Sequence, residues 1–259
     1  MRQRYLLPSE DEVRRGKDCL RVGPVEAGIP CLVATSRWQF IVQTIRSRGI
    51  KTVNFIQTIK CIPQIIKHRK LFRALLSNYL FFLSNPEEPA WGSITEDDEE
   101  GIKHAVTLAS NYEGPIVEIG ALFGHTTNLL ASLKVKDTPL IAIENFSWNP
   151  FCLPPNAHRM FAKRTIRYSI DHCSTQIFDG DADTFYSENV NLKPSLVFID
   201  AAHDYESVMR DIGWAVRTGC PVIMGHDYID VHPGVIKAVD ETFSGNISVY
   251  GSVWVHEKP

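Results

Sequence analysis

The stretch LVFIDAAHDYESVMRDI, residues 196–212, decides the fold class of this chain, together with CPVIMGHDY at residues 220–228. Each contains a short apolar run, Leu196–Ile199 and Val222–Met224, of the kind that forms a strand buried on both faces. Between the two runs, Tyr205–Arg217 is expected to form a helix. A strand, a helix and a second strand in this order predict two parallel strands joined by a right-handed crossover.

Titratable side chains stand directly after both apolar runs: Asp200 and His203 after the first, and His226 and Asp227 after the second. The carboxyl ends of neighbouring parallel strands meet at one edge of a sheet, where open α/β folds place their ligand crevice. Carboxylates and imidazoles gathered at that edge indicate a reaction centre that could hold a divalent cation beside a general base.

Strands and helices alternate along residues 95–259. The expected strands are Ile116–Ile119, Leu140–Ile143, Thr175–Phe178, Leu196–Ile199, Val222–Met224, Ile247–Tyr250 and Val253–His256. The expected helices are 96–110, which Thr95 caps, Gly124–Leu133, Asn156–Tyr168, Tyr205–Arg217 and Gly234–Phe243. Repeated β-α units predict a Rossmann-like α/β fold with a seven-stranded, mainly parallel sheet, which the last two strands close as an antiparallel hairpin.

The charge of the chain is unevenly distributed. Residues 1–90 hold 15 basic and 7 acidic side chains, a balance of +8, whereas residues 91–259 hold 12 and 23, a balance of −11. We therefore expect a basic N-terminal accessory, lid or docking region over 1–90 and one α/β domain over 91–259, with a boundary near Asn85–Pro89. A composition that is 44% hydrophobic and 22% charged provides a sizeable core and excludes a largely disordered chain.

The N-terminal region contains a strongly basic segment. Residues 27–86 have nine basic and no acidic side chains, so they could contact an anionic membrane surface, a phosphate-linked carrier or a neighbouring subunit, or form a solvated face. Within this segment Lys67–Leu83 is predicted to be a helix, packed in a core or lying on a membrane interface. We also expect a homo-oligomer. No nucleic-acid partner is expected, because the larger domain is acidic and has no recognition motif.

The sequence indicates a cytoplasmic protein that could also bind peripherally to a membrane. It shows no signal peptide and no apolar window long enough to cross a bilayer. The six cysteines have neither C-x-x-C nor zinc-like spacing and are expected to be reduced thiols.

The first strand of the larger domain ends in VEIGALFGHTT, residues 117–127. Gly120 and Gly124 allow a tight turn and the close approach of a ligand, although an ordinary strand-to-helix turn would use them too. The pattern is not G-x-G-x-x-G, so a dinucleotide site is not favoured. Glu144, at the end of the second strand, could accept both hydroxyls of a ribose, and Asp181, after the third, could reach an adenine edge.

The motifs follow one another as V-E-I-G-A-L-F-G-H-T-T, I-E-N, G-D-A, F-I-D-A-A-H-D-Y-E and G-H-D-Y, with P-G-V-I-K-A-V-D after the last. This order resembles the class I S-adenosylmethionine-dependent methyltransferases. It is most similar to the branch that contains the macrolide-sugar O-methyltransferases and the cephalosporin-hydroxylase-like proteins. The resemblance covers about residues 95–259, and residues 1–90 lie outside it.

The resemblance implies roles for individual residues. It implies an S-adenosylmethionine site formed by Glu118, Gly120, Phe123, Gly124, Thr126, Thr127, Glu144 and Asp181. It also implies a Mg²⁺ site at Asp200 and Asp227, with His203 as the general base. Several sugar methyltransferases of the branch have an acidic residue where this chain has His226, the third metal candidate. Because Mg²⁺ favours oxygen ligands, His226 could favour a softer metal or orient substrate without one.

Together these features predict a metal-assisted O-methyltransferase that acts on a hydroxyl of a sugar, glycan or glycosylated natural product. A hydroxyl bound to a divalent ion loses its proton more readily, and an imidazole within reach can take that proton. Two alternatives stay open. One is a non-catalytic cofactor-binding scaffold, and the other is a metal-dependent oxidising or hydrolytic enzyme that uses Asp200, His203 and Asp227.

Overall fold

The computed structural model describes residues 55–70, 72–73, 76 and 94–258. The chain divides into two units between Thr52 and Val53, and the first unit lies outside the described residues. The predicted boundary at Asn85–Pro89 and most of the basic segment 27–86 also lie outside them. The division into regions 1–90 and 91–259 therefore stays a prediction.

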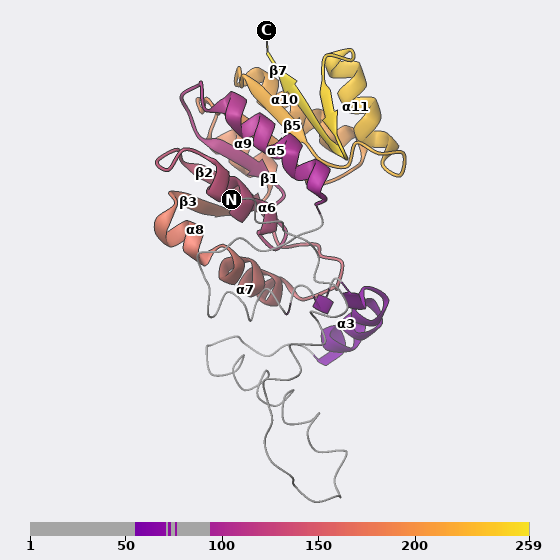
Figure 1. Cartoon of the computed structure of the whole chain (residues 1–259). Helices are drawn as coiled ribbons and strands as arrows, with labels where there is room; N and C mark the ends of the chain where they lie inside the picture. The colour runs from indigo at the N-terminus through magenta and orange to yellow at the C-terminus, as the bar shows by residue number, and fades with distance from the viewer. Residues whose placement is uncertain (1–54, 71, 74–75, 77–93, 259) are drawn as a thin grey trace, which may run out of the picture. The chain divides into compact units, whose positions relative to one another are not determined.

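The described part of the larger unit is an α/β domain (Figure 1). Its strands are β1 Ile116–Ile119, β2 Leu140–Glu144, β3 Thr175–Asp179, β4 Leu196–Ile199, β5 Val222–Gly225, β6 Ser248–Tyr250 and β7 Val253–Glu257. Its helices are α3 Phe55–Lys67, α5 Glu96–Ala109, α6 His125–Leu133, α7 Pro155–Thr165, α8 Arg167–His172, α9 Ala182–Glu188, α10 Tyr205–Arg217 and α11 Pro233–Phe243.

The seven described strands form one sheet in the order β3-β2-β1-β4-β5-β7-β6. β1 to β5 run parallel, whereas β7 pairs antiparallel with both β5 and β6. This topology confirms the predicted Rossmann-like sheet and its closing hairpin. The predicted strands match because each central one is a short apolar run between turn residues.

Alternate residues of the central strands face opposite sides of the sheet, so the core has two layers. Val117, Val197 and Ile223 pack with α9, α10 and α11 on one side. Their neighbours Ile116 and Leu196 pack with α5 and α6 on the other. Helices on both faces explain why these strands are apolar throughout instead of alternating with polar residues.

Helix α5 begins at a capping box, as the sequence predicted. The side chain of Thr95 accepts a hydrogen bond from the N–H of Asp98, and the carboxylate of Asp98 accepts one from the N–H of Thr95. This exchange satisfies two N–H groups that a helix otherwise leaves without partners. Asp98 is only 1% exposed, so it is a buried carboxylate as well as a cap.

Three helices differ from the prediction. The helix expected over Asn156–Tyr168 is divided into α7 and α8 at Ile166. Helix α9 was not predicted, because its seven residues are too few to show a helical period. Helix α3 ends at Lys67, the residue at which the helix Lys67–Leu83 was expected to begin. Residues 69–70, 72–73 and 76 are also helical, and the remainder of that prediction lies outside the described residues.

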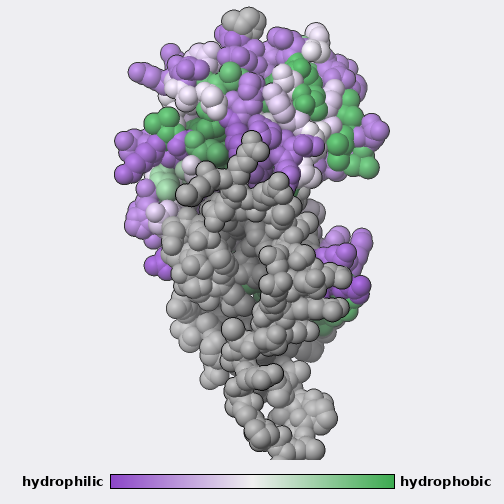
Figure 2. Space-filling model, in the orientation of Figure 1, coloured by the Kyte–Doolittle hydropathy of each residue, from purple (hydrophilic) through white to green (hydrophobic). Residues whose placement is uncertain are grey.

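The described residues include no helix that is both long and apolar enough to cross a membrane. On the face that Figure 2 shows, their surface mixes hydrophilic and hydrophobic side chains.

Candidate active site

The carboxyl ends of β1, β4 and β5 meet where the strand order reverses. From β1 the chain moves outward to β2 and β3 and then returns to β4 on the other side of β1. The loops that leave these strands are joined by backbone hydrogen bonds: the N–H of Asp200 donates to Ile119 O (2.9 Å), and that of His226 to Ile199 O (3.1 Å). The polar residues after β4 and β5 therefore lie beside the loop after β1, where open α/β sheets bind ligands.

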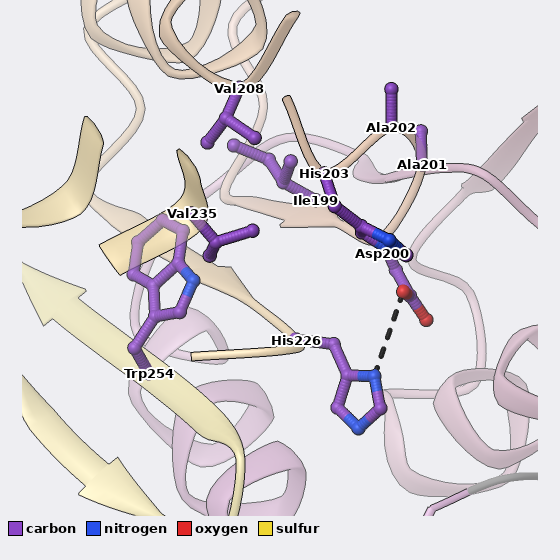
Figure 3. A pocket seen from close by; sticks show the side chains of 9 residues that line it. All are labelled: Ile199, Asp200, Ala201, Ala202, His203, Val208, His226, Val235 and Trp254. Atoms are coloured by element: carbon purple, nitrogen blue, oxygen red, sulfur yellow. Dashed lines mark ion pairs between the residues drawn. The ribbon is translucent and has the colours of Figure 1, made fainter. Parts of the chain in front are cut away.

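A small pocket lies at this point of the domain. In Figure 3 the side chains of Asp200 and His226 point toward each other. The pocket is lined by Ile199, Asp200, Ala201, Ala202, His203, Val208, His226, Val235 and Trp254. The structure thus brings together three of the four titratable residues that the sequence selected, and the fourth, Asp227, contacts His203 directly.

His203 and Asp227 form a close pair. Nε2 of His203 lies 2.9 Å from Oδ2 of Asp227, and the His203 side chain is 38% exposed, so a ligand can reach it. The hydrogen bond to Asp227 raises the pKa of His203 above its ordinary value. Burial alone would raise the pKa of Asp227, but its contacts with His203 and His226 hold it well below the ordinary range. Asp227 is therefore a carboxylate that orients the imidazole and makes it a stronger base.

His226 is buried between carboxylates. Its Nδ1 lies 3.6 Å from Oδ1 of Asp200 and 3.5 Å from Oδ1 of Asp227. Burial would lower the pKa of His226, but the interactions with these two acids outweigh it and raise the pKa to about 10. Without a bound cation the imidazole is therefore protonated and supplies the positive charge between the two acids.

The same three atoms also fit a divalent ion. Asp200, His226 and Asp227 each offer one ligand atom, all within 4.8 Å of one another. Two ligands at about 2.1 Å from one tetrahedral ion lie roughly 3.4 Å apart, which is close to the spacings of Nδ1 from both carboxylates. Mg²⁺ fits this donor set poorly because one donor is nitrogen, whereas ions that accept imidazole fit it well.

Asp98 and Ser252 complete the surroundings of His226, and no sequence motif marked them as site residues. The Ser252 Oγ lies 2.9 Å from Nε2 of His226 and 2.9 Å from Oδ1 of Asp98. The acidic start of α5 was visible in the sequence and was interpreted as a helix signal. Its contact with the hairpin turn, 154 residues along the chain, arises only in the fold.

His232 lies on the other side of Asp227. Its Nε2 is 3.9 Å from Oδ1 of Asp227, and its ring centre is 4.2 Å from that of His203. His203, Asp227 and His232 therefore form a second group whose ligand atoms lie within 4.8 Å of one another. His232 is not among the metal candidates that the sequence marked, which are Asp200, His226 and Asp227.

Glu118, one of the predicted cofactor residues, has a carboxylate oxygen without a partner in the part of the chain that the structure describes. The residue is fully buried, its Oε2 accepts a hydrogen bond from the Thr127 hydroxyl, and its Oε1 has no partner among the described residues. Burial raises the pKa of Glu118 to about 8. A buried polar atom without a partner is costly, so a ligand group that donates to Oε1 would relieve it. Glu118 and Thr127 thus fit the predicted cofactor site.

Gly120 and Gly124 are needed for the shape of the loop after β1. Both have positive φ, +95° and +80°. A Cβ at Gly120 would lie 2.1 Å from the carbonyl oxygen of Asp200, and one at Gly124 would lie 2.3 Å from a methyl carbon of Ile166. These glycines let the loop pack against the residue after β4 and against Ile166 between α7 and α8, which suffices to explain them without a ligand.

Glu144 joins two loops at the end of β2. Its carboxylate accepts the N–H of Leu122 at 2.7 Å and that of Phe146 at 2.8 Å. Each carboxylate oxygen can accept a further hydrogen bond, so this use leaves capacity for ribose hydroxyls.

The remaining cofactor candidates have local contacts. Asp181 caps α9 by accepting hydrogen bonds from the N–H and hydroxyl of Thr184. Phe123 is buried against Phe151, and Thr126 is half-buried in the first turn of α6. Their predicted contacts with the cofactor stay predictions.

Comparison with known proteins identifies the fold. No family model and no curated protein matches the sequence. Two similar solved structures are of CalS11, a TDP-rhamnose 3'-O-methyltransferase of calicheamicin biosynthesis. One is 11% identical with a TM-score of 0.53, covering 91% of this chain and 99% of that one. The other is 10% identical with a TM-score of 0.51, covering 72% and 93%.

A third similar structure is the O-methyltransferase from Bacillus cereus in complex with SAH. It is 17% identical with a TM-score of 0.50, and the match covers 86% of this chain and 99% of that one. At these identities the similarity shows the fold, and the fold is that of the class I methyltransferases, as the sequence predicted.

Proposed function

We propose that this protein is an S-adenosylmethionine-dependent O-methyltransferase that methylates a hydroxyl of a sugar, glycan or glycosylated natural product. The observation that carries the proposal is the pair of His203 and Asp227, 2.9 Å apart, at the switch point of a class I methyltransferase fold. The acceptor class is supported by the sequence resemblance and by CalS11, which acts on a rhamnose hydroxyl.

His203 is the general base of this proposal. The carboxylate of Asp227 can only accept, so Nε2–H of His203 donates to it and Nδ1 is left as the basic nitrogen. When bound, S-adenosylmethionine supplies a methyl group that its positive sulfur has already activated. As the acceptor oxygen takes up that methyl group, its proton would pass to Nδ1 of His203. A positioned base typically contributes ~10²–10⁴-fold to such a step.

Metal assistance is part of the proposal. Asp200, Asp227 and His226 would hold the ion, which would supply positive charge that lowers the pKa of the acceptor hydroxyl. Glu118, in β1, and Glu144, the last residue of β2, would hold the cofactor. The remaining task of the chain is to place the hydroxyl in line with the methyl group, which can contribute several kcal/mol.

Calorimetry and a transfer assay test the proposal. We expect the protein to bind S-adenosylmethionine and S-adenosylhomocysteine and to methylate a member of a panel of nucleotide-linked and carrier-linked sugars. His203→Ala should reduce turnover at least ~10²-fold with cofactor affinity unchanged. His172→Ala, at the exposed end of α8, is the matched control and should change neither. Absence of binding to both cofactor forms would sink the proposal. Binding without transfer to any acceptor would favour the scaffold alternative.

A second candidate is a metal-dependent enzyme of another class. It is favoured by the group of two imidazoles and one carboxylate formed by His203, His232 and Asp227, which is the ligand set of many iron enzymes. Metal analysis of the purified protein discriminates between the two. Stoichiometric iron lost in His232→Ala would support this candidate, and iron-free protein that transfers methyl groups would exclude it.

A further inference from the structure

The hydroxyl of Ser252 connects a buried carboxylate to His226. Its Oγ lies 2.9 Å from Oδ1 of Asp98 and 2.9 Å from Nε2 of His226. The N–H of Ser252 also donates to Oδ1 of Asp98 at 2.7 Å. A chain of hydrogen bonds therefore runs from the start of α5, through the turn between β6 and β7, to the residue after β5.

The groups that can only donate decide which atom donates in each of these hydrogen bonds. Asp98 receives the N–H of Thr95 and the N–H of Ser252, groups that can only donate, one on each carboxylate oxygen. Asp98 is therefore an acceptor, and the single hydroxyl hydrogen of Ser252 is donated to it. The Ser252 oxygen must then accept from His226, which places a proton on Nε2 of that ring.

The surroundings hold this arrangement firmly. The side chains of His226 and Asp98 are 8% and 2% exposed. Gly251 brings the turn so close to Asp98 that a Cβ there would lie 2.6 Å from Oδ1. The carbonyl of Ser252 accepts the N–H of Tyr228 at 3.0 Å, so the turn is bonded to the loop after β5 a second time. The ring of His226 is consequently fixed with Nε2 toward Ser252.

The other ring nitrogen faces the two site carboxylates. Nδ1 is 3.6 Å from Asp200 and 3.5 Å from Asp227, too far for good hydrogen bonds. In metalloproteins the ligating histidine almost always donates its second N–H to a fixed acceptor, and that acceptor sets the tautomer and orientation of the ring. The hydroxyl of Ser252 is such an acceptor for His226, and its own hydrogen bond to Asp98 fixes its position.

We propose that Asp98 and Ser252 are positioning residues that keep His226 in the Nε2–H form, so that its Nδ1 joins Asp200 and Asp227 in binding a borderline first-row divalent ion in preference to Mg²⁺. The inference rests on the proposed function and specifies the ion that assists it. The preference follows from the nitrogen ligand, since imidazole suits such ions and Mg²⁺ favours an all-oxygen set.

Metal titration of the full chain tests the preference. We expect Co²⁺ to bind at least ~10-fold more tightly than Mg²⁺. His226→Asp, which makes all three ligands carboxylates, should reduce this preference for Co²⁺. Ser252→Ala should weaken Co²⁺ binding ~10–100-fold, the usual effect of losing such a partner. Ser252→Thr, which keeps the hydroxyl, should retain it, and Ser248→Ala on the exposed strand β6 is the control.

Nuclear magnetic resonance of the ¹⁵N-labelled protein tests the tautomer independently of activity. With Zn²⁺ bound, the His226 ring should carry its proton on Nε2 alone, and Ser252→Ala should disturb that signal while the fold is retained. We choose Ser252→Ala over a substitution of Asp98 because it should not unfold the protein. The backbone N–H of residue 252 still donates to Asp98, and the capping box of α5 stays intact.

Several outcomes would overturn the inference. They are equal affinities for Mg²⁺ and Co²⁺, a His226 ring that keeps both protons in the presence of Zn²⁺, and Ser252→Ala binding Co²⁺ like the parent. Methyl transfer by metal-free protein would refute this inference and leave the methyltransferase proposal standing. Selective Co²⁺ binding in a protein that binds no cofactor would support this inference and refute the methyltransferase proposal.

Discussion

Oδ2 of Asp227 lies 2.9 Å from Nε2 of His203, whereas Oδ1 of the same carboxylate faces His226. One acid thus contacts both imidazoles: one oxygen orients His203, the proposed base, and the other is available to a cation. Asp227 has φ +59°, a left-handed conformation that an aspartate tolerates better than most residues. The turn after β5 therefore aims the carboxylate between the two imidazoles.

The first prediction concerns the pKa of His203. In metal-free protein the hydrogen bond to Asp227 should hold this pKa above 6.5, and Asp227→Asn should lower it. Because the folded-state pKa is raised, the pair stabilises the fold fully below pH 6.5 and loses that effect as pH rises through the raised value. A histidine titration by nuclear magnetic resonance checks the shift, with His172 as the exposed reference. An unchanged His203 pKa in Asp227→Asn would contradict it.

A second prediction follows from the burial of Glu118. Its pKa of about 8 in the folded state lies above the ordinary value of 4.5, so the folded protein binds the extra proton between these limits. Stability from this residue is thus fully present below pH 4.5 and is lost as pH rises through about 8. Glu118→Gln, which can still accept from Thr127, should remove a slope of roughly 1 kcal/mol per pH unit. Urea denaturation across this range measures it, and parallel curves for the two proteins would refute it.

The strands and the residues at their carboxyl ends could be predicted because both signals are local. An apolar run of four residues such as Leu196–Ile199 marks a buried strand, and the next residue must lie at the edge of the sheet. The partnership of Asp98 with Ser252 could not be predicted, because the antiparallel return of β7 alone brings the hairpin turn to α5. The role of Asp181 as a helix cap could not be predicted either. Its position suggested a ligand contact, and the short helix α9 that it caps shows no helical period in the sequence.

A third prediction concerns the cap of α5. Thr95→Ala removes the side chain that accepts from the N–H of Asp98, and it should destabilise the protein by about 1 kcal/mol. Thr107→Ala in the same helix is the control, because Thr107 is exposed and alanine favours the helix. Its effect should be close to zero or stabilising. Chemical denaturation of both variants measures the difference, and equal effects would show that the capping box contributes little.

The last prediction separates two reasons for glycine in the loop after β1. Gly124 and Gly219 both have positive φ, +80° and +75°, so alanine at either position is strained by about 1 kcal/mol or more. A Cβ at Gly219 meets nothing within 4 Å, whereas one at Gly124 would lie 2.3 Å from the side chain of Ile166. Gly124→Ala should therefore cost ~1–3 kcal/mol more than Gly219→Ala, the usual penalty of overpacking. Chemical denaturation without cofactor measures both. Equal costs would mean that Ile166 moves aside freely and that Gly124 is required by its conformation alone.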